Sequence, residues 1–129
     1  MKAILDTSVV IASGVDGLEG ELAVSAATLA ELHYGVLVAR DDGTRAERLR
    51  RLSVVERHFD PLPVDGAVAR SYGRLAAAVA RSGRQTRAWV MDLLIAATAH
   101  ANDARLYTAN PKDLRAIEDQ VEIVTVRVA

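Results

Sequence analysis

The chain has no cysteine and no long apolar run, and each absence excludes a kind of protein. Without cysteine there is no disulfide, no thiolate nucleophile and none of the usual structural zinc sites. No stretch approaches the ~20 apolar residues that a membrane span requires. Residues 1–6 carry no secretory signal pattern. We therefore expect a cytoplasmic protein that does not enter a membrane.

Lysine is also scarce: of 16 basic residues only Lys2 and Lys112 are lysines. The net charge is −1, which excludes a bulk attraction to nucleic acid and makes the distribution of charge more informative than its sum. Residues 66–91 contain five arginines and no acidic residue, namely Arg70, Arg74, Arg81, Arg84 and Arg87. This basic strip is either a solvated surface or a contact for phosphate groups.

The length of 129 residues predicts a single domain over residues 1–129. Strands are expected at 2–5, 22–24, 105–108 and 121–128, with a short one near 64. Helix starts are expected at Asp6–Ser8, at Ser25, at a capping box over 44–47, at Asp65, at Asp92 and at Asn110–Pro111. Tyr34 and Tyr72 fall on or beside apolar stripes and are expected in the core. Alternating strands and helices predict an α/β fold with a parallel sheet between helical layers.

Four acidic residues stand where such a fold gathers its ligands, beyond the carboxyl ends of the strands. Asp6 and Asp113 follow expected strands, Asp92 opens a helix that is apolar almost all round, and Glu31 lies among small residues on its own helix. Asp6, Asp92 and Asp113 have an alternative role as helix caps, and Glu31 as a surface residue.

Four converging carboxylates would repel one another, which would raise some of their pKa values and destabilise the fold. A divalent cation removes that difficulty, and an all-oxygen ligand set favours Mg²⁺ or Mn²⁺. Such a site is suited to metal-assisted hydrolysis of phosphodiester bonds.

The four acids lie in motifs that resemble a known family. Ile4-Leu5-Asp6-Thr7-Ser8, Ala30-Glu31-Leu32, Asp92-Leu93-Leu94-Ile95-Ala96-Ala97 and Thr108-Ala109-Asn110-Pro111-Lys112-Asp113 resemble, in order and spacing, the PIN-domain family. Within that family they are most similar to the VapC-type toxin ribonucleases of bacterial type II toxin–antitoxin modules. The resemblance spans essentially the whole chain. It departs at Leu114, where phenylalanine is usual, and in a bulkier approach to Asp92 around Trp89.

The resemblance implies a three-layer α/β/α domain and an endoribonuclease that needs Mg²⁺ or Mn²⁺ and cuts structured RNA such as transfer or ribosomal RNA. It places Asp6, Glu31, Asp92 and Asp113 at the metal site, and the number of ions bound there, one or two, is left open. The supporting residues would be Thr7, Ser8, Thr108 and Asn110. Given a nuclease, Arg84 and Arg87 are the candidates for RNA contact because, of the five arginines, they lie nearest to Asp92 in the sequence. It further implies a homodimer and a VapB-type antitoxin that binds the helical region 29–59.

Other functions fit the residues less well. A signalling receiver domain needs an acidic pair after its first strand, where this chain has Thr7 and Ser8, and a late lysine, for which only Lys112 is available. A phosphatase with an Asp-x-Asp nucleophile fails at Ser8 for the same reason. A non-catalytic RNA- or protein-binding module of the same fold remains an alternative, although all four acids are present. His33, His58 and His100 have no metal-ligand spacing and are expected to be non-catalytic.

Overall fold

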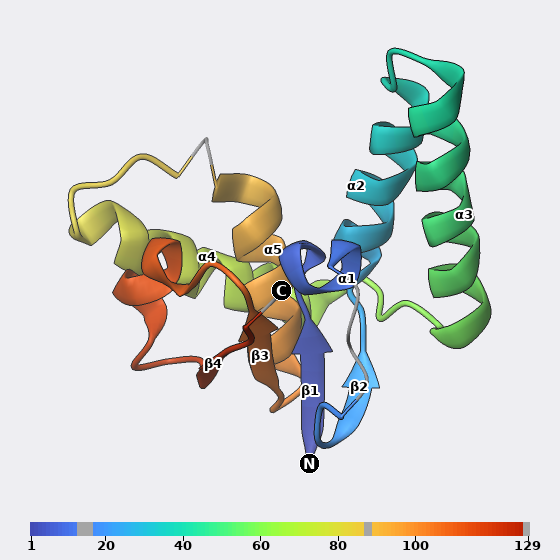
Figure 1. The fold of residues 1–129 in the computed structure, drawn as a ribbon. Coiled ribbons are helices and arrows are strands. Elements are labelled where there is room, and N and C mark those ends of the chain that lie inside the picture. The colour runs from blue at the N-terminus through green and yellow to red at the C-terminus, as the bar shows by residue number, and fades with distance from the viewer. Residues whose placement is uncertain (13–16, 87–88, 128–129) are drawn as a thin grey trace.

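A sheet of four short strands organises the molecule (Figure 1). The computed structural model describes residues 1–12, 17–86 and 89–127. The strands are β1 (Lys2–Leu5), β2 (Glu21–Ala23), β3 (Arg105–Thr108) and β4 (Ile123–Thr125), in the order β2-β1-β3-β4, and every pairing is parallel. The expected α/β class with a parallel sheet is confirmed.

Alternating side chains of the central strands separate two apolar clusters. Ile4 and Leu106 lie in one cluster, together with residues of α4 (Gly66–Arg81) and α5 (Val90–Ala101). Leu5 and Tyr107 lie in the other cluster, with residues of α1 (Thr7–Ile11), α2 (Ala26–Leu37) and α3 (Asp42–His58). Because each strand contributes to both faces, the sheet is the middle of three layers.

The starts of three helices follow the sequence prediction. Asp6, Ser25 and Asp65 cap α1, α2 and α4, each accepting a hydrogen bond from a backbone N–H of the first turn. These caps satisfy donors that have no partner inside the helix. The N-termini of these helices are therefore fixed by local sequence.

Several other boundaries differ from the prediction. Asp41, not the expected box at 44–47, caps α3, and its carboxylate accepts the Thr44 N–H. Helix α5 begins at Val90, so Asp92 lies within its first turn. The short strand expected near 64 does not form, and Leu62 instead makes an isolated parallel bridge to Ser25, beyond the end of β2. Within the described residues, strand β4 is shorter than the expected 121–128 because the edge of β3 offers it few residues to pair with, and residue 128 lies outside those residues.

Helices α2 and α3 form a hairpin that extends past the carboxyl end of the strands (Figure 1). This geometry leaves the outer turns of α2 without a layer to cover them. The expectation that Tyr34 lies in the core is therefore wrong, since Tyr34 is 68% exposed. Tyr72, on α4, does pack against the core.

The carboxyl ends of β1 and β3 lead directly into the segments that carry the acidic residues. Asp6 follows β1, and β3 continues through Ala109 into the 3₁₀ helix η2 (Pro111–Ile117), which carries Asp113. The topology thus brings Asp6 and Asp113 to one edge of the sheet. Among the described helices, none is both long and apolar enough to cross a membrane.

Candidate active site

Asp6 is held in place at the junction of β1 and α1. Its Oδ1 accepts hydrogen bonds from the Val9 N–H at 3.2 Å and from the Ser8 hydroxyl. The Ser8 Oγ accepts in turn the Ala109 N–H at 3.0 Å, from the loop that follows β3. Ser8 therefore connects the ends of two strands and orients Asp6.

Glu31 is oriented by hydroxyl groups from two helices. Thr7, the first residue of α1, donates a 2.6 Å hydrogen bond to Oε1 of Glu31. The Thr7 Oγ1 also lies 3.2 Å from the hydroxyl of Thr28, which is fully buried one turn before Glu31 on α2. A half-buried Glu31 with a fixed hydrogen bond is not the surface residue that the alternative interpretation required.

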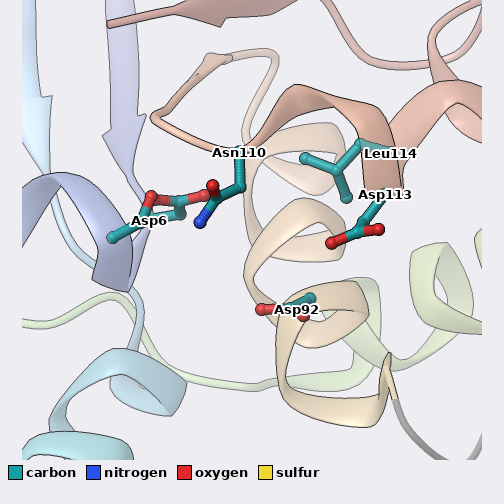
Figure 2. Close-up of a pocket in the computed structure, with 6 residues that line it drawn as sticks. Asp6, Asp92, Asn110, Asp113 and Leu114 are labelled. Atoms are coloured by element: carbon teal, nitrogen blue, oxygen red, sulfur yellow. The ribbon is translucent and has the colours of Figure 1, made fainter. Parts of the chain in front are cut away.

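The aspartates meet in a small pocket of about 80 Å³. Figure 2 shows Asp6, Asp92 and Asp113 around this pocket, arriving from β1, α5 and η2, with the side chain of Asn110 beside Asp6. Leu114 forms part of its wall. Residues that are far apart in the sequence are thus brought to one place by three separate elements.

Thr108 and Asn110 have different roles in this arrangement. Thr108 is fully buried and its Oγ1 accepts the Asn110 N–H at 3.0 Å, which fixes the turn that follows β3. The Asn110 side chain lines the pocket itself. Thr108 therefore acts on the backbone, and Asn110 is the one of the two that faces the carboxylates.

The electrostatics of the pocket centre on Asp92. Although this residue is exposed on the whole, its carboxyl group lies in the pocket, and loss of water there raises its pKa from 3.8 to about 6. Glu31, Asp6 and Asp113 add to this rise through charge repulsion, in that order. The other three acids therefore lie close enough to Asp92 to repel its charge.

The residues suit a hard divalent cation in their chemistry. The donors are carboxylate oxygens, and after the loss of water it is the charge of the three neighbouring acids that raises the pKa of Asp92. As the side chains stand, no set of three Asp, Glu or His residues in the described ranges is close enough together to hold an ion. A cation would therefore have to draw the carboxylates closer together.

A basic side chain lies at the rim of the pocket. Arg84 Nη2 is 3.6 Å from Oδ1 of Asp113, and its guanidinium lies 4.9 Å from the centre of the Trp89 ring. Trp89 is partly buried and packs against the core. Arg87, the other candidate for RNA contact, lies outside the described residues.

The histidines lie elsewhere. His100 pairs with the Ser71 hydroxyl at 2.7 Å between α5 and α4, and His33 lies opposite Glu56 on the α2–α3 hairpin at 3.6 Å. None of the three histidines lines the acidic pocket. This is consistent with a non-catalytic role.

Two contributors to the site were not identified from the sequence. In the sequence Thr28 is only one of the small residues around Glu31, although its hydroxyl, three residues before Glu31 on the same helix, is a signal that could identify it. The Ala109 N–H, which binds Ser8, gives no signal in the sequence because any residue except proline supplies that donor.

The raised pKa of Asp92 predicts how the metal-free protein responds to pH. In the folded state Asp92 keeps its proton up to about pH 6, whereas in the unfolded chain it loses it near 3.8. The free energy of unfolding therefore falls as the pH rises between these values. In the presence of a chelator at pH 7.5, we expect Asp92→Asn to be more stable than wild type by about 1 kcal/mol, after discounting for solvent screening. Urea unfolding at pH 7.5 and below pH 4 measures this difference.

The gain should vanish below pH 4, where both states of the wild type carry the proton. Asp60→Asn, at an exposed aspartate after α3, is the control and should gain nothing. A loss of stability in Asp92→Asn at both pH values would contradict the repulsion and would favour a role for Asp92 as a structural part of α5.

Comparison with known proteins extends these observations. The family model of the PIN domain matches residues 3–120. Ribonuclease VapC5 of Mycobacterium tuberculosis is 36% identical over 131 residues, covering 97% of this chain and 94% of the relative. Ribonuclease VapC8 of the same species is 40% identical over 100 residues, covering 74% of this chain and 88% of the relative.

Solved structures agree with this assignment. A crystal structure of VapBC-5 from Mycobacterium tuberculosis, a member of the VapBC family of toxin–antitoxin systems, superposes with a TM-score of 0.82 and 38% identity over 98% of both chains. VapBC2 from Rickettsia felis, at 22% identity and a TM-score of 0.79, shares the fold. The resemblance to the VapC proteins is confirmed, and the chain belongs to the PIN-domain family.

Proposed function

We propose that this protein is a divalent-metal-dependent endoribonuclease, the toxin of a toxin–antitoxin pair. The observation that supports this most directly is the convergence of Asp6, Asp92 and Asp113 on one pocket, with Glu31 close enough to raise the pKa of Asp92. Relatives at 36% and 40% identity are named as ribonucleases. A binding module would have no need to keep four mutually repelling acids together.

The four carboxylates would hold Mg²⁺, or Mn²⁺ in its place, between β1, α2, α5 and η2. A bound ion would supply a Lewis acid that lowers the pKa of water and neutralises charge on the phosphate. Ser8 and Thr7 orient Asp6 and Glu31 through the hydrogen bonds described above. Asn110 lines the same pocket and offers an amide donor to a phosphate oxygen.

The reaction is the hydrolysis of an RNA phosphodiester. The oxygen of a water molecule forms a bond to phosphorus in line with the bond to the 3′ oxygen, which breaks. The water loses a proton to a carboxylate of the site, and the departing oxygen takes up a proton. The products are a 5′-phosphate and a 3′-hydroxyl, and the substrate class is structured RNA such as transfer or ribosomal RNA.

Replacing the acids tests this proposal. With Mg²⁺ or Mn²⁺ and total bacterial RNA, the wild type should yield discrete fragments, and a chelator should prevent them. Asp6→Asn and Asp92→Asn should each reduce the rate at least 100-fold, because each removes a charge from the cation-binding set. Asparagine retains the ability of residue 6 to cap α1, so the fold should survive in that variant.

Asp60→Asn serves as the matched control and should cut at the wild-type rate. End-mapping of the fragments identifies the RNA and the chemistry of its ends. The proposal would be contradicted if the wild-type protein cut no RNA, or if the acid variants cut as well as the wild type. Either result would favour the non-catalytic binding module.

The hydrogen bond from Thr7 to Glu31 predicts a graded response. Thr7→Val removes the hydroxyl at nearly constant volume, and we expect the cleavage rate to fall about 10- to 100-fold because Glu31 loses its orientation. Thr7→Ser keeps the donor and should restore most of the rate. Steady-state kinetics with the two variants measures this. Equal rates for Val and Ser would show that the hydroxyl does not matter.

The α2–α3 hairpin is the proposed docking surface for a VapB-type antitoxin. Five large apolar side chains are exposed on it, namely Tyr34, Leu37, Val38, Leu49 and Val54. An exposed apolar patch of this kind commonly marks a protein interface. The surface belongs to the region 29–59 expected from the resemblance, and the related VapBC-5 structure is of a toxin–antitoxin family member. Homodimerisation and a cytoplasmic location stay predictions.

Leu37 tests the docking surface because it is 78% exposed and its replacement should leave the fold intact. We expect Leu37→Glu to cut RNA like wild type but to resist neutralisation by the cognate VapB-type antitoxin, with inhibition weakened at least tenfold. Titrating the antitoxin into the cleavage assay measures this. Val64→Glu, at an exposed valine before α4, should be neutralised normally. Normal neutralisation of Leu37→Glu would move the interface elsewhere.

A further inference from the structure

The position of Arg84 is set by the end of α4. Ser82 is the C-cap, Gly83 follows in the left-handed region with φ +86°, and the chain then reverses direction. The Gly83 N–H binds the Ala80 carbonyl at 3.0 Å, and the Arg84 N–H binds the Val79 carbonyl at 3.3 Å. These two bonds form a Schellman motif, for which glycine is the favoured residue in the left-handed position. The backbone of Arg84 is thus firmly fixed to the helix.

Two groups then hold the side chain of Arg84 at the rim of the acidic pocket. The carboxylate of Asp113 lies 3.6 Å from one terminal nitrogen, and the ring of Trp89 lies 4.9 Å from the guanidinium carbon. Arg84 is 40% exposed and Asp113 is 30% exposed, so the pair is accessible to solutes. Trp89 is partly buried, packs against the core and gives Arg84 a support that does not depend on Asp113.

Asp113 consequently has two competing uses. It lines the acidic pocket, where it is one of the carboxylates proposed to hold a divalent cation, and it also neutralises Arg84. A carboxylate drawn toward a divalent cation has less attraction left for a guanidinium. Arg84 would then stay over Trp89 with its charge free, beside the place where an RNA phosphate has to lie.

We propose that Arg84 is a built-in counter-ion of Asp113 that a divalent cation displaces, after which Arg84 binds a phosphate of the RNA substrate. Arg84 is therefore a substrate-binding residue whose availability depends on the cation, and Trp89 is the residue that positions it. This inference rests on the proposed function, since it assigns a role to Arg84 in RNA binding. It explains why a fixed arginine lies against a carboxylate of the acidic site.

The inference predicts opposite effects of one substitution on two ligands. Arg84→Gln removes the competitor of the cation, so Mg²⁺ should bind the RNA-free protein about two- to fivefold more tightly, the size expected for a half-exposed ion pair. The same variant loses a phosphate contact, so KM for RNA should rise about tenfold with little change in kcat. A structural defect at the site would instead weaken both.

Calorimetric titration with Mg²⁺ alone and steady-state cleavage kinetics measure the two effects. Plotted against log salt concentration, log kcat/KM has a negative slope, and in Arg84→Gln the magnitude of this slope should decrease by about 0.7–0.9, as expected for one lost phosphate contact. Arg84→Lys keeps the charge and should recover much of the KM. Arg81→Gln, at an exposed arginine in the last turn of α4, controls for the general loss of positive charge and should show neither effect.

The outcomes separate this inference from the proposed function. If the wild type cuts RNA and Arg84→Gln has an unchanged KM, the inference is overturned and the proposed ribonuclease activity stands. The same holds if Arg84→Gln binds Mg²⁺ as tightly as the wild type or more weakly. Absence of cleavage by the wild type would overturn both the ribonuclease and the RNA-binding role of Arg84. Tighter Mg²⁺ binding together with a raised KM would support the exchange.

Discussion

The repulsion among four carboxylates is the constraint on which the rest of the site depends. The parallel order of the strands brings Asp6 and Asp113 to one edge of the sheet, and α5 and α2 add Asp92 and Glu31. The fold offsets part of the resulting cost with donors supplied by its own chain, including the Ser8 and Thr7 hydroxyls. Loss of water and the remaining repulsion together raise the pKa of Asp92, and the proposed cation would relieve that repulsion.

The helices that carry the acids are also tied to one another away from the pocket. The Thr98 hydroxyl on α5 donates to the Ser25 Oγ at 2.9 Å, and Ser25 caps α2 by accepting the Ala27 N–H. Both side chains are fully buried. Because a buried polar group without a partner is costly, the hydroxyl pair fixes α5 against the start of α2. The spacing between Asp92 and Glu31 is thereby controlled from within the core.

Much of the fold and of the candidate site could be predicted from the sequence because both depend largely on local sequence signals. The caps at Asp6, Ser25 and Asp65 and the alternation of strands with helices depend on neighbouring residues. Asp6, Asp92 and Asp113 could be predicted because each follows or opens such an element, and Glu31 because it lies among small residues on its own helix. The predictions that were wrong depend on distant parts of the chain. Tyr34 is exposed because the α2–α3 hairpin extends past the end of the sheet, and β4 is short because β3 limits its pairing. The contact of Arg84 with Asp113 depends on the packing of α4 against η2 and has no sequence signature.

The two carboxylate oxygens of Asp6 differ in the hydrogen bonds that they accept. The bonds that Asp6 accepts in the described structure all go to Oδ1, which starts α1 and receives the Ser8 hydroxyl. Oδ1 thus serves the architecture, whereas Oδ2 accepts none of these bonds. Asparagine at position 6 can accept the same bonds with its side-chain oxygen, but it carries no negative charge. Natural substitutions at this position would therefore separate the fold from the proposed chemistry, since asparagine preserves the helix cap and alanine removes both the cap and the charge.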